Sequence, residues 1–416
     1  MYKFFIFIGL MIVAEAIYAV ETYKTRTIGE NIKTLTVGIE GEKFLIPVIE
    51  MTSDQRIMVS FDELSHESKA YSYEVIHCNA DWTPSSLSSS EFIDGYTKAD
   101  ITDFQRSVNT HILYTHYRFR LPNDEIKLKV SGNYVVNIFE DNMRDKPIAQ
   151  ACFSVVDPKV EITASVRSNT DIELNGRYQQ LDFEVKLNGY QVRDAVTEII
   201  PVVRQNNRID NEVRNLKPYT FSAGKISYIN NKALIFEGGN EFRIFDISSV
   251  YNAGRGVNEL KFNQKHYECF LTPERMKPKT YLSEQDVNGR FLINSQESFN
   301  DINTEADYFL VHFSIPAQGP FFDGLLYLGG DFTHNLYNAS TLMQYDNEKS
   351  AYTKSLFLKQ GGYNYQYRFL TKGSTKAMNE RTEGSFWQTS NEYTIYVYHR
   401  GWGERYDRLI GVYSHQ

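Results

Sequence analysis

The sequence predicts an all-β protein built from tandem antiparallel β-sandwich domains of the immunoglobulin-like or early-set kind. Aromatic residues make up 14% of the 416 residues, and they recur with a period of two, as side chains on one face of a strand do. Turn residues recur about every ten positions, as expected for short strands in series. Helical periodicity is confined to one short turn around Ser88 to Asp94.

Alternation is clearest in two stretches. In residues 363–369 every second side chain is aromatic and the others are polar, and residues 71–78 alternate in a similar way. Residues 233–237 and 241–247 flank Gly238-Gly239-Asn240, and glycine reaches the positive φ that tight turns demand. These last two stretches are therefore predicted to form a hairpin.

Two breaks suggest where domains end. Val155-Val156-Asp157-Pro158 closes one patterned run, since proline interrupts a ladder and restrains the residue before it. A second break lies between Pro273 and Asn303, where prolines, a glycine and polar residues intervene. Because the chain exceeds what one core usually organises, we expect three β-sandwich domains, covering 20–157, 158–280 and 281–416.

The N-terminus has the pattern of a secretory signal peptide over residues 1–19. Lys3 precedes an apolar run from Phe4 to Ala14, and small residues at Ala16 and Ala19 offer two cleavage positions. The apolar run is roughly half of the ~20 residues that a bilayer span requires. No later stretch is long enough either, so the sequence predicts an exported, soluble mature chain with no transmembrane segment.

Charge and cysteine content narrow the function classes. A formal net charge of −8 without a basic stripe argues against nucleic acid as a partner. Cys78, Cys152 and Cys269 are too few and too scattered for a disulfide framework or a zinc site. Cys78 and Cys152 fall in strands of one predicted domain, so a bridge between them and two buried free thiols both remain open.

The residues that tempt a catalytic interpretation do not form a site. Gly254-Arg255-Gly256 lacks the third glycine and the helix of a dinucleotide site. His111 and His116 are five apart, which places them on opposite faces of a continuous strand, so they are interpreted as polar packing groups. Asp81 and Asp94 are interpreted as turn caps. The sequence therefore predicts no enzyme, with no catalytic, cofactor-binding or metal-binding residue.

Large aromatic side chains in loops are candidates for partner contacts. Trp82 and Trp402 each lie in a loop-like context, where a ring can anchor a partner or stack on a sugar. The alternative is that each ring covers the open end of its own sandwich. The partner-interface candidates are Trp82, Tyr96, Tyr114, His116 and Trp402.

Nine short stretches follow one another along almost the whole chain. They are H-C-N-A-D-W-T-P-S at 77–85, F-I-D-G-Y at 92–96, Y-T-H-Y-R-F-R-L-P-N at 114–123, S-G-N-Y at 131–134, D-K-P at 145–147, F-E-G-G-N-E-F-R at 236–243, K-Q-G-G-Y-N-Y at 359–365, E-G-S-F-W-Q-T-S-N-E-Y at 383–393 and R-Y-D-R-L-I-G at 405–411. Together they resemble the plug protein of the type IX secretion system, a family of Bacteroidota long catalogued as a domain of unknown function.

The resemblance implies a periplasmic protein, peripherally associated with the outer membrane through its partner. It would dock on the inner mouth of a large outer-membrane translocon barrel and close it while no cargo passes. The resemblance implies no cofactor. It supplies no catalytic or interface residue that can be carried over to this chain.

An exported glycan-binding module is the alternative function. Residues 326–332 and the strand that follows Gly361-Gly362 look like early-set modules that bind starch-type glycans. Those modules usually carry a tryptophan shortly after the Gly-Asp-Phe segment, whereas this sequence has His334-Asn335-Leu336 there. That difference weakens the glycan hypothesis.

Overall fold

The computed structural model describes residues 22–141, 143, 146–281 and 283–415. The chain is mostly β, with 45% strand, 4% helix and several antiparallel sheets, which confirms the predicted all-β class, while the immunoglobulin-like or early-set kind stays a prediction. The expected short turn is helix α1 (Ser89–Phe92). None of the helices in the described part of the chain is long and apolar enough to cross a membrane. The predicted signal peptide, residues 1–19, lies outside the described residues.

Three large hydrophobic clusters divide the sheets, and we call the sheets that share one cluster a unit. The first unit has one sheet in the order β1-β12-β11-β5-β7, with β3 beside β12, a second sheet in the order β2-β4-β9-β8, and the pair β10-β6. The bounds are β1 Arg26–Thr27, β2 Ile32–Ile39, β3 Val48–Glu50, β4 Ile57–Glu63, β5 Tyr71–Cys78, β6 Ile93–Gly95, β7 Lys98–Asp100, β8 Asp103–Arg106, β9 Thr115–Leu121, β10 Ile126–Leu128, β11 Gly132–Glu140 and β12 Ala149–Val156.

Strand β5 shows how alternation builds the first unit. Tyr71, Tyr73 and Val75 point into the core between the two sheets, and the Tyr73 ring stacks on Phe119 of the facing sheet at 4.1 Å. The opposite face of β5 carries Cys78, which is also buried. Both faces of this sheet are therefore covered.

The second unit contains strands from two distant parts of the chain. One sheet has the order β13-β14-β17-β16, with β18 beside β14, and the other has the order β15-β28-β29. The bounds are β13 Glu161–Arg167, β14 Tyr178–Lys186, β15 Ile199–Gln205, β16 Thr220–Ser222, β17 Lys225–Tyr228, the 3₁₀ helix η1 Lys232–Leu234, β18 Ile235–Glu237, β28 Tyr393–His399 and β29 Arg408–His415.

The third unit is inserted between β18 and β28. Its sheets have the orders β20-β21-β23-β26-β25 and β19-β27-β22, with β24 beside β27. The bounds are β19 Arg243–Asp246, β20 Val257–Phe262, β21 Tyr267–Leu271, β22 Phe291–Ile293, α2 Ile302–Glu305, β23 Tyr308–Pro316, β24 Gly324–Gly329, the 3₁₀ helix η2 Asp331–Thr333, β25 Gln344–Asp346, β26 Ala351–Lys359 and β27 Gly361–Thr371.

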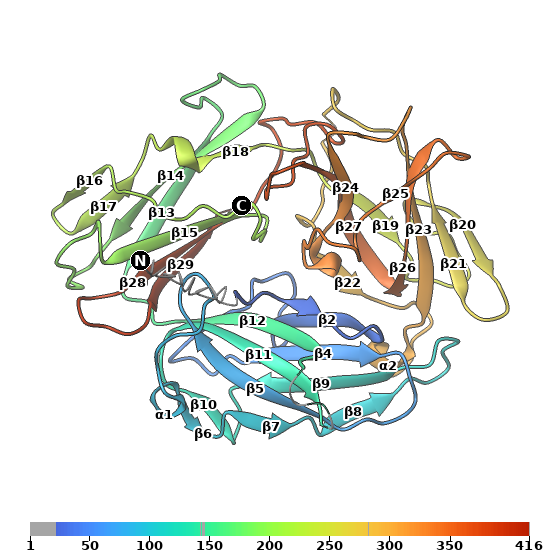
Figure 1. The fold of residues 1–416 in the computed structure, drawn as a ribbon, viewed down its shortest axis with the longest axis horizontal. Coiled ribbons are helices and arrows are strands. Elements are labelled where there is room, and N and C mark those ends of the chain that lie inside the picture. Colours follow the sequence, from blue (N-terminus) through green and yellow to red (C-terminus); the bar gives the residue numbers. More distant parts are fainter. Residues whose placement is uncertain (1–21, 142, 144–145, 282, 416) are drawn as a thin grey trace, which may run out of the picture.

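The three units surround a common centre (Figure 1). The strand pairing departs from the predicted ranges 158–280 and 281–416, because the C-terminal hairpin β28-β29 pairs with β15 of the second unit. The expected break between Pro273 and Asn303 does not separate sheets either, since β21 and β23 on its two sides pair in parallel.

The predicted hairpin at Gly238-Gly239-Asn240 is wrong. Strand β18 before it pairs with β14, whereas β19 after it pairs with β27, so the chain crosses here from the second unit to the third. Gly239 does have a positive φ of 67°. A Cβ on Gly238 would lie 2.2 Å from the carbonyl oxygen of Phe386. Glycine is needed for a close crossing rather than for a hairpin turn.

We predict that all three cysteines stay reduced and unreactive in the folded protein. Cys78, Cys152 and Cys269 are buried free thiols, and burial raises the pKa of each. Strand β11 lies between Cys78 and Cys152, which separates their Cα atoms by roughly two strand spacings, about 10 Å, more than a disulfide spans. Maleimide labelling should therefore require denaturant, and intact mass should not change on reduction. A mass increase of two hydrogens on reduction contradicts the prediction.

Candidate functional site

The contacts between units hold most of the polar chemistry of this chain. At the first junction, the loop after β5 meets the C-terminal hairpin. The Ala80 main-chain N–H donates to Oδ2 of Asp407 at 2.8 Å, and the Arg400 guanidinium donates to Oδ1 of Asn79 at 2.7 Å. Because these partners lie more than 300 positions apart in sequence, the loop fixes the first unit against the second.

Trp82, an expected partner contact, lies inside this junction. Its side chain is only 6% exposed, and the Arg204 guanidinium of β15 lies 5.8 Å from the ring centroid. Its backbone has a positive φ of 66°, a conformation that bulky residues adopt only under constraint. The ring therefore packs units together and is not available to stack on a sugar or an external partner.

The second junction is organised by the buried carboxylate of Asp62. It accepts from Nζ of Lys359 at 2.6 Å, from Nδ1 of His116 at 2.6 Å and from the Tyr308 hydroxyl at 2.7 Å. All four side chains are buried. Burial alone would raise the pKa of the Asp62 carboxyl, but Lys359 and His116 outweigh it and hold that pKa below its ordinary value. A charged cluster therefore connects β4 and β9 with β23 and β26.

Tyr114 belongs to the same junction. The Lys359 ammonium lies 4.1 Å from its ring centroid, close enough for a cation–π interaction, and its hydroxyl donates to the carbonyl of Ala306 at 2.8 Å. Tyr114 and His116 were expected to contact a partner. The structure instead places both in the interior, where they join the first unit to the third.

At the third junction, the segment between β27 and β28 lies between the second and third units. The Arg243 guanidinium and the Glu383 carboxylate form a fully buried pair at 2.9 Å, and Glu383 also accepts the main-chain N–H of Tyr367 at 2.9 Å. On the other side, Glu237 of β18 accepts the main-chain N–H of Asn379 at 2.9 Å. This segment is therefore bound to both units.

The short stretches noted in the sequence meet in pairs at these junctions. Ala80 contacts Asp407, Tyr114 and His116 contact the cluster around Lys359, and Arg243 contacts Glu383. The paired stretches are 77–85 with 405–411, 114–123 with 359–365, and 236–243 with 383–393. The residues of these paired stretches therefore specify how the units pack against one another.

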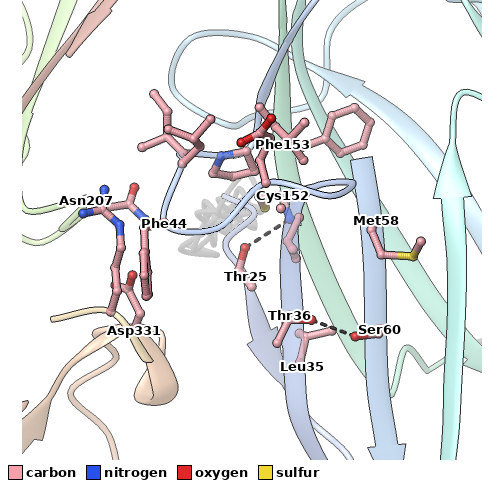
Figure 2. Close-up of a pocket in the computed structure, with 18 of the residues that line it drawn as sticks. Thr25, Leu35, Thr36, Phe44, Met58, Ser60, Cys152, Phe153, Asn207 and Asp331 are labelled. Atoms are coloured by element: carbon pink, nitrogen blue, oxygen red, sulfur yellow. Dashed lines mark hydrogen bonds between the residues drawn. The ribbon is translucent and has the colours of Figure 1, made fainter. Parts of the chain in front are cut away.

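A cavity of about 590 Å³ lies where the three units converge. Figure 2 shows Phe44 of the first unit, Asn207 of the second and Asp331 of the third at one end of it. Burial raises the pKa of the Asp331 carboxyl to about 7 and lowers the pKa of the His334 imidazole to about 4. Phe44 has a positive φ of 65°. The volume is within the range of ligand pockets in proteins.

The described residues contain no group of three or more His, Cys, Asp or Glu side chains arranged to hold a metal ion. His111 and His116, considered above as a pair, lie apart. His111 contacts Asp307 at 2.9 Å, whereas His116 contacts Asp62. Each histidine is therefore engaged by its own carboxylate.

Tyr96 and Trp402 are the two candidates that the structure leaves on the surface, at 71% and 87% exposure. Trp402 lies in the loop between β28 and β29, and Arg405 of the same loop pairs with Glu91 of α1. Tyr96 follows α1 by four residues. Trp402 therefore belongs to a loop that takes part in the first junction, and Tyr96 is close in sequence to the helix that this loop contacts.

The groups that organise the junctions were missed in the sequence. Asp62, Lys359, Glu383 and Arg243 were not singled out as junction residues. The signal in the sequence was a charged residue inside a predicted strand, next to large apolar residues, as Asp62 is next to Phe61. In the structure Phe61, Asp62 and Glu63 are all fully or almost fully buried.

Comparison with known proteins supports one family. The family model of the type 9 secretion system plug protein, first domain, matches residues 32–157. A crystal structure of a hypothetical protein from Parabacteroides merdae is 40% identical, with a TM-score of 0.93 over 95% of this chain and 99% of that chain. No curated protein matches the sequence.

These features define a mostly β protein whose units are joined by buried polar contacts between distant parts of the chain. Over residues 32–157 the chain belongs to the type 9 secretion system plug protein family, as its first domain. The resemblance drawn from the sequence is thereby confirmed.

We predict that Lys359→Met lowers the free energy of unfolding by about 3–5 kcal/mol, because the Asp62 carboxylate is left buried without its ammonium partner. Lys349→Met is the matched control, since Lys349 is exposed and lies 3.5 Å from Asp346, a surface pair that contributes less than about 1 kcal/mol. Urea unfolding followed by circular dichroism measures both. Equal losses in the two variants contradict the prediction.

We predict that Asp331→Asn changes how stability depends on pH. Because its pKa is raised to about 7, the folded carboxyl keeps its proton between pH ~4 and ~7 while the unfolded chain has lost it. The wild-type protein therefore loses stability as pH rises through that window. The variant lacks this loss, so its stability relative to wild type should increase by roughly 1–3 kcal/mol from pH 5 to pH 8. Parallel pH curves for the two proteins rule this out.

Proposed function

We propose that this protein is a non-catalytic periplasmic plug. It docks on the periplasmic mouth of the outer-membrane translocon of the type IX secretion system and closes the channel when no cargo is passing. Membership of the plug protein family supports this function directly, and the proposed location is the periplasm, with the protein held at the outer membrane by its partner. Each of the three units is proposed to be a sandwich domain of the immunoglobulin-like or early-set type, and the first of them covers residues 20–157.

The main structural support for the proposal is the set of buried ion pairs that hold the units in fixed positions relative to one another. A stopper for a wide pore must keep its shape under load, and separating the first and third units would break the ion pair of Asp62 with Lys359, both at most 1% exposed. The Arg243–Glu383 pair holds the third unit to the intervening segment in the same way. Breaking such buried pairs is costly, so the units move as one body.

Tyr96 and Trp402 are the proposed contacts with the translocon. Large exposed aromatics are the residues that most often anchor a protein interface, and in sequence Trp402 lies three residues from Arg405 and Tyr96 five residues from Glu91, the two members of one ion pair. Trp82, Tyr114 and His116 are excluded from this role because their side chains are buried between units.

Co-purification tests the proposal. Tagged protein, expressed in its own host and extracted in mild detergent, should retain a large outer-membrane protein. The double variant Tyr96→Ala, Trp402→Ala should weaken this retention by about 30-fold, the effect of losing one strong anchor of about 2 kcal/mol. Tyr251→Ala is the control, because Tyr251 is 82% exposed but lies in the third unit.

Absence of any large outer-membrane protein from the wild-type sample would sink the proposal. Binding of the purified protein to a glycan array, lost in Trp402→Ala, would instead support the exported glycan-binding alternative. Equal weakening by Tyr251→Ala would show that the docking face is not the one proposed.

A further inference from the structure

Two sheets present open edges to the central cavity. Strand β2 is the last strand of its sheet in the first unit, and β22 is the last strand of its sheet in the third. Residues 35–39 of β2 and 291–293 of β22 line the same cavity. An open edge carries main-chain N–H and C=O groups that no neighbouring strand satisfies.

The register shows which groups of β2 point into this space. The Glu40 N–H donates to the carbonyl of Arg56, directly opposite, at 2.8 Å. In an antiparallel pair the bonding direction alternates from residue to residue, so Gly38 faces β4. The main chain of Val37 then faces away from the sheet. No strand in the described part of the chain pairs with β2 on that side.

The same argument applies to β22. Asn294 donates to the carbonyl of Gln360 at 3.1 Å, and Asn364 donates to the carbonyl of Arg290 at 3.1 Å. Residues 290, 292 and 294 therefore face β27, and the main chain of Phe291 and Ile293 faces away from it. The cavity thus meets outward-directed donors and acceptors from two different units.

Only one kind of ligand matches a row of alternating main-chain donors and acceptors at strand spacing, namely another extended polypeptide. We propose that the central cavity takes an extended segment of the translocon, which adds as a strand to the open edge of β2 opposite β22. This inference rests on the proposed function for the source of the segment. It adds a second, internal contact to the surface contact at Tyr96 and Trp402.

The cavity walls indicate the chemistry of that segment. The lining combines apolar side chains, such as Met58 of the first unit and Leu292 of the third, with charged ones, such as Arg118 and Arg290, so the segment is expected to carry both apolar and polar side chains.

The site can be probed without disturbing the fold. A Cβ built on Gly38 meets no atom within 4 Å, so a side chain can begin there without a clash at Cβ. Photoreactive benzoylphenylalanine is placed at this position, and one in place of the 83% exposed Phe322 serves as the control. Irradiation of the full-length protein in its host should crosslink position 38, and not 322, to one short segment of the translocon, located by mass spectrometry of the crosslinked peptide.

A substitution that removes a main-chain N–H group provides a second, independent test. Val37→Pro removes the outward N–H of an edge strand, where proline is tolerated, while Val37→Thr keeps the N–H and the branched shape. Val37→Pro should weaken retention of the translocon by about tenfold or more, with a melting temperature within a few degrees of that of Val37→Thr.

The outcomes separate the two proposals. If wild-type protein retains no translocon, the proposed function fails and this inference with it. If retention is normal but position 38 gives no translocon crosslink, or Val37→Pro binds as Val37→Thr does, the inference alone is overturned. A crosslink from position 38 to a second copy, to residues of this chain before 22, or to another periplasmic protein also overturns it.

Discussion

The arrangement of the whole chain depends on the cost of burying charge. Asp62 is completely buried, and a carboxylate in such a place is tolerated only when it is paired and hydrogen-bonded. Its ammonium partner is supplied by Lys359, almost 300 residues further along the chain. A buried pair of this kind adds little net stability compared with an apolar contact. Its effect is specificity, because any other placement of the first unit against the third separates the Asp62 carboxylate from the Lys359 ammonium.

The same principle explains why the chain returns on itself. Strands β28 and β29 complete a sheet begun by β15 and bring Arg400 and Asp407 to the loop after β5. The sheets of the second unit are therefore complete only when β28 and β29, the last two strands of the described chain, have paired with β15 and with each other. The junctions contain residues from both ends of the described chain, so the three units form one structure in which each unit depends on the other two. This dependence is what a rigid stopper requires, and a string of independent sandwiches would not provide it.

Local patterns in the sequence predicted local structure well. The alternation in residues 71–78 and 363–369 identified β5 and β27, because a strand's two faces are set by a period of two. The polar face of β27 does not lie in solvent, because Gln366 and Arg368 are 1% exposed and another part of the chain covers them. Whether a polar face meets water or a neighbouring unit depends on contacts between distant residues, and alternation contains no such information. Trp82 was misassigned for the same reason, because an aromatic residue in a loop has one sequence signature whether it anchors a partner or a neighbouring unit.

The open edges at the centre follow from how three sandwiches meet. A sandwich has edge strands, and an edge exposed on the outer surface invites pairing with other copies. In this chain the edges of β2 and β22 line a cavity of about 590 Å³ between units, and the occupant proposed for it is a single extended segment. Since the junctions hold the walls in place, such a segment would meet a prearranged edge and lose less free energy to ordering of the site. Rigidity at the junctions and selectivity at the centre are thus two consequences of the same packing.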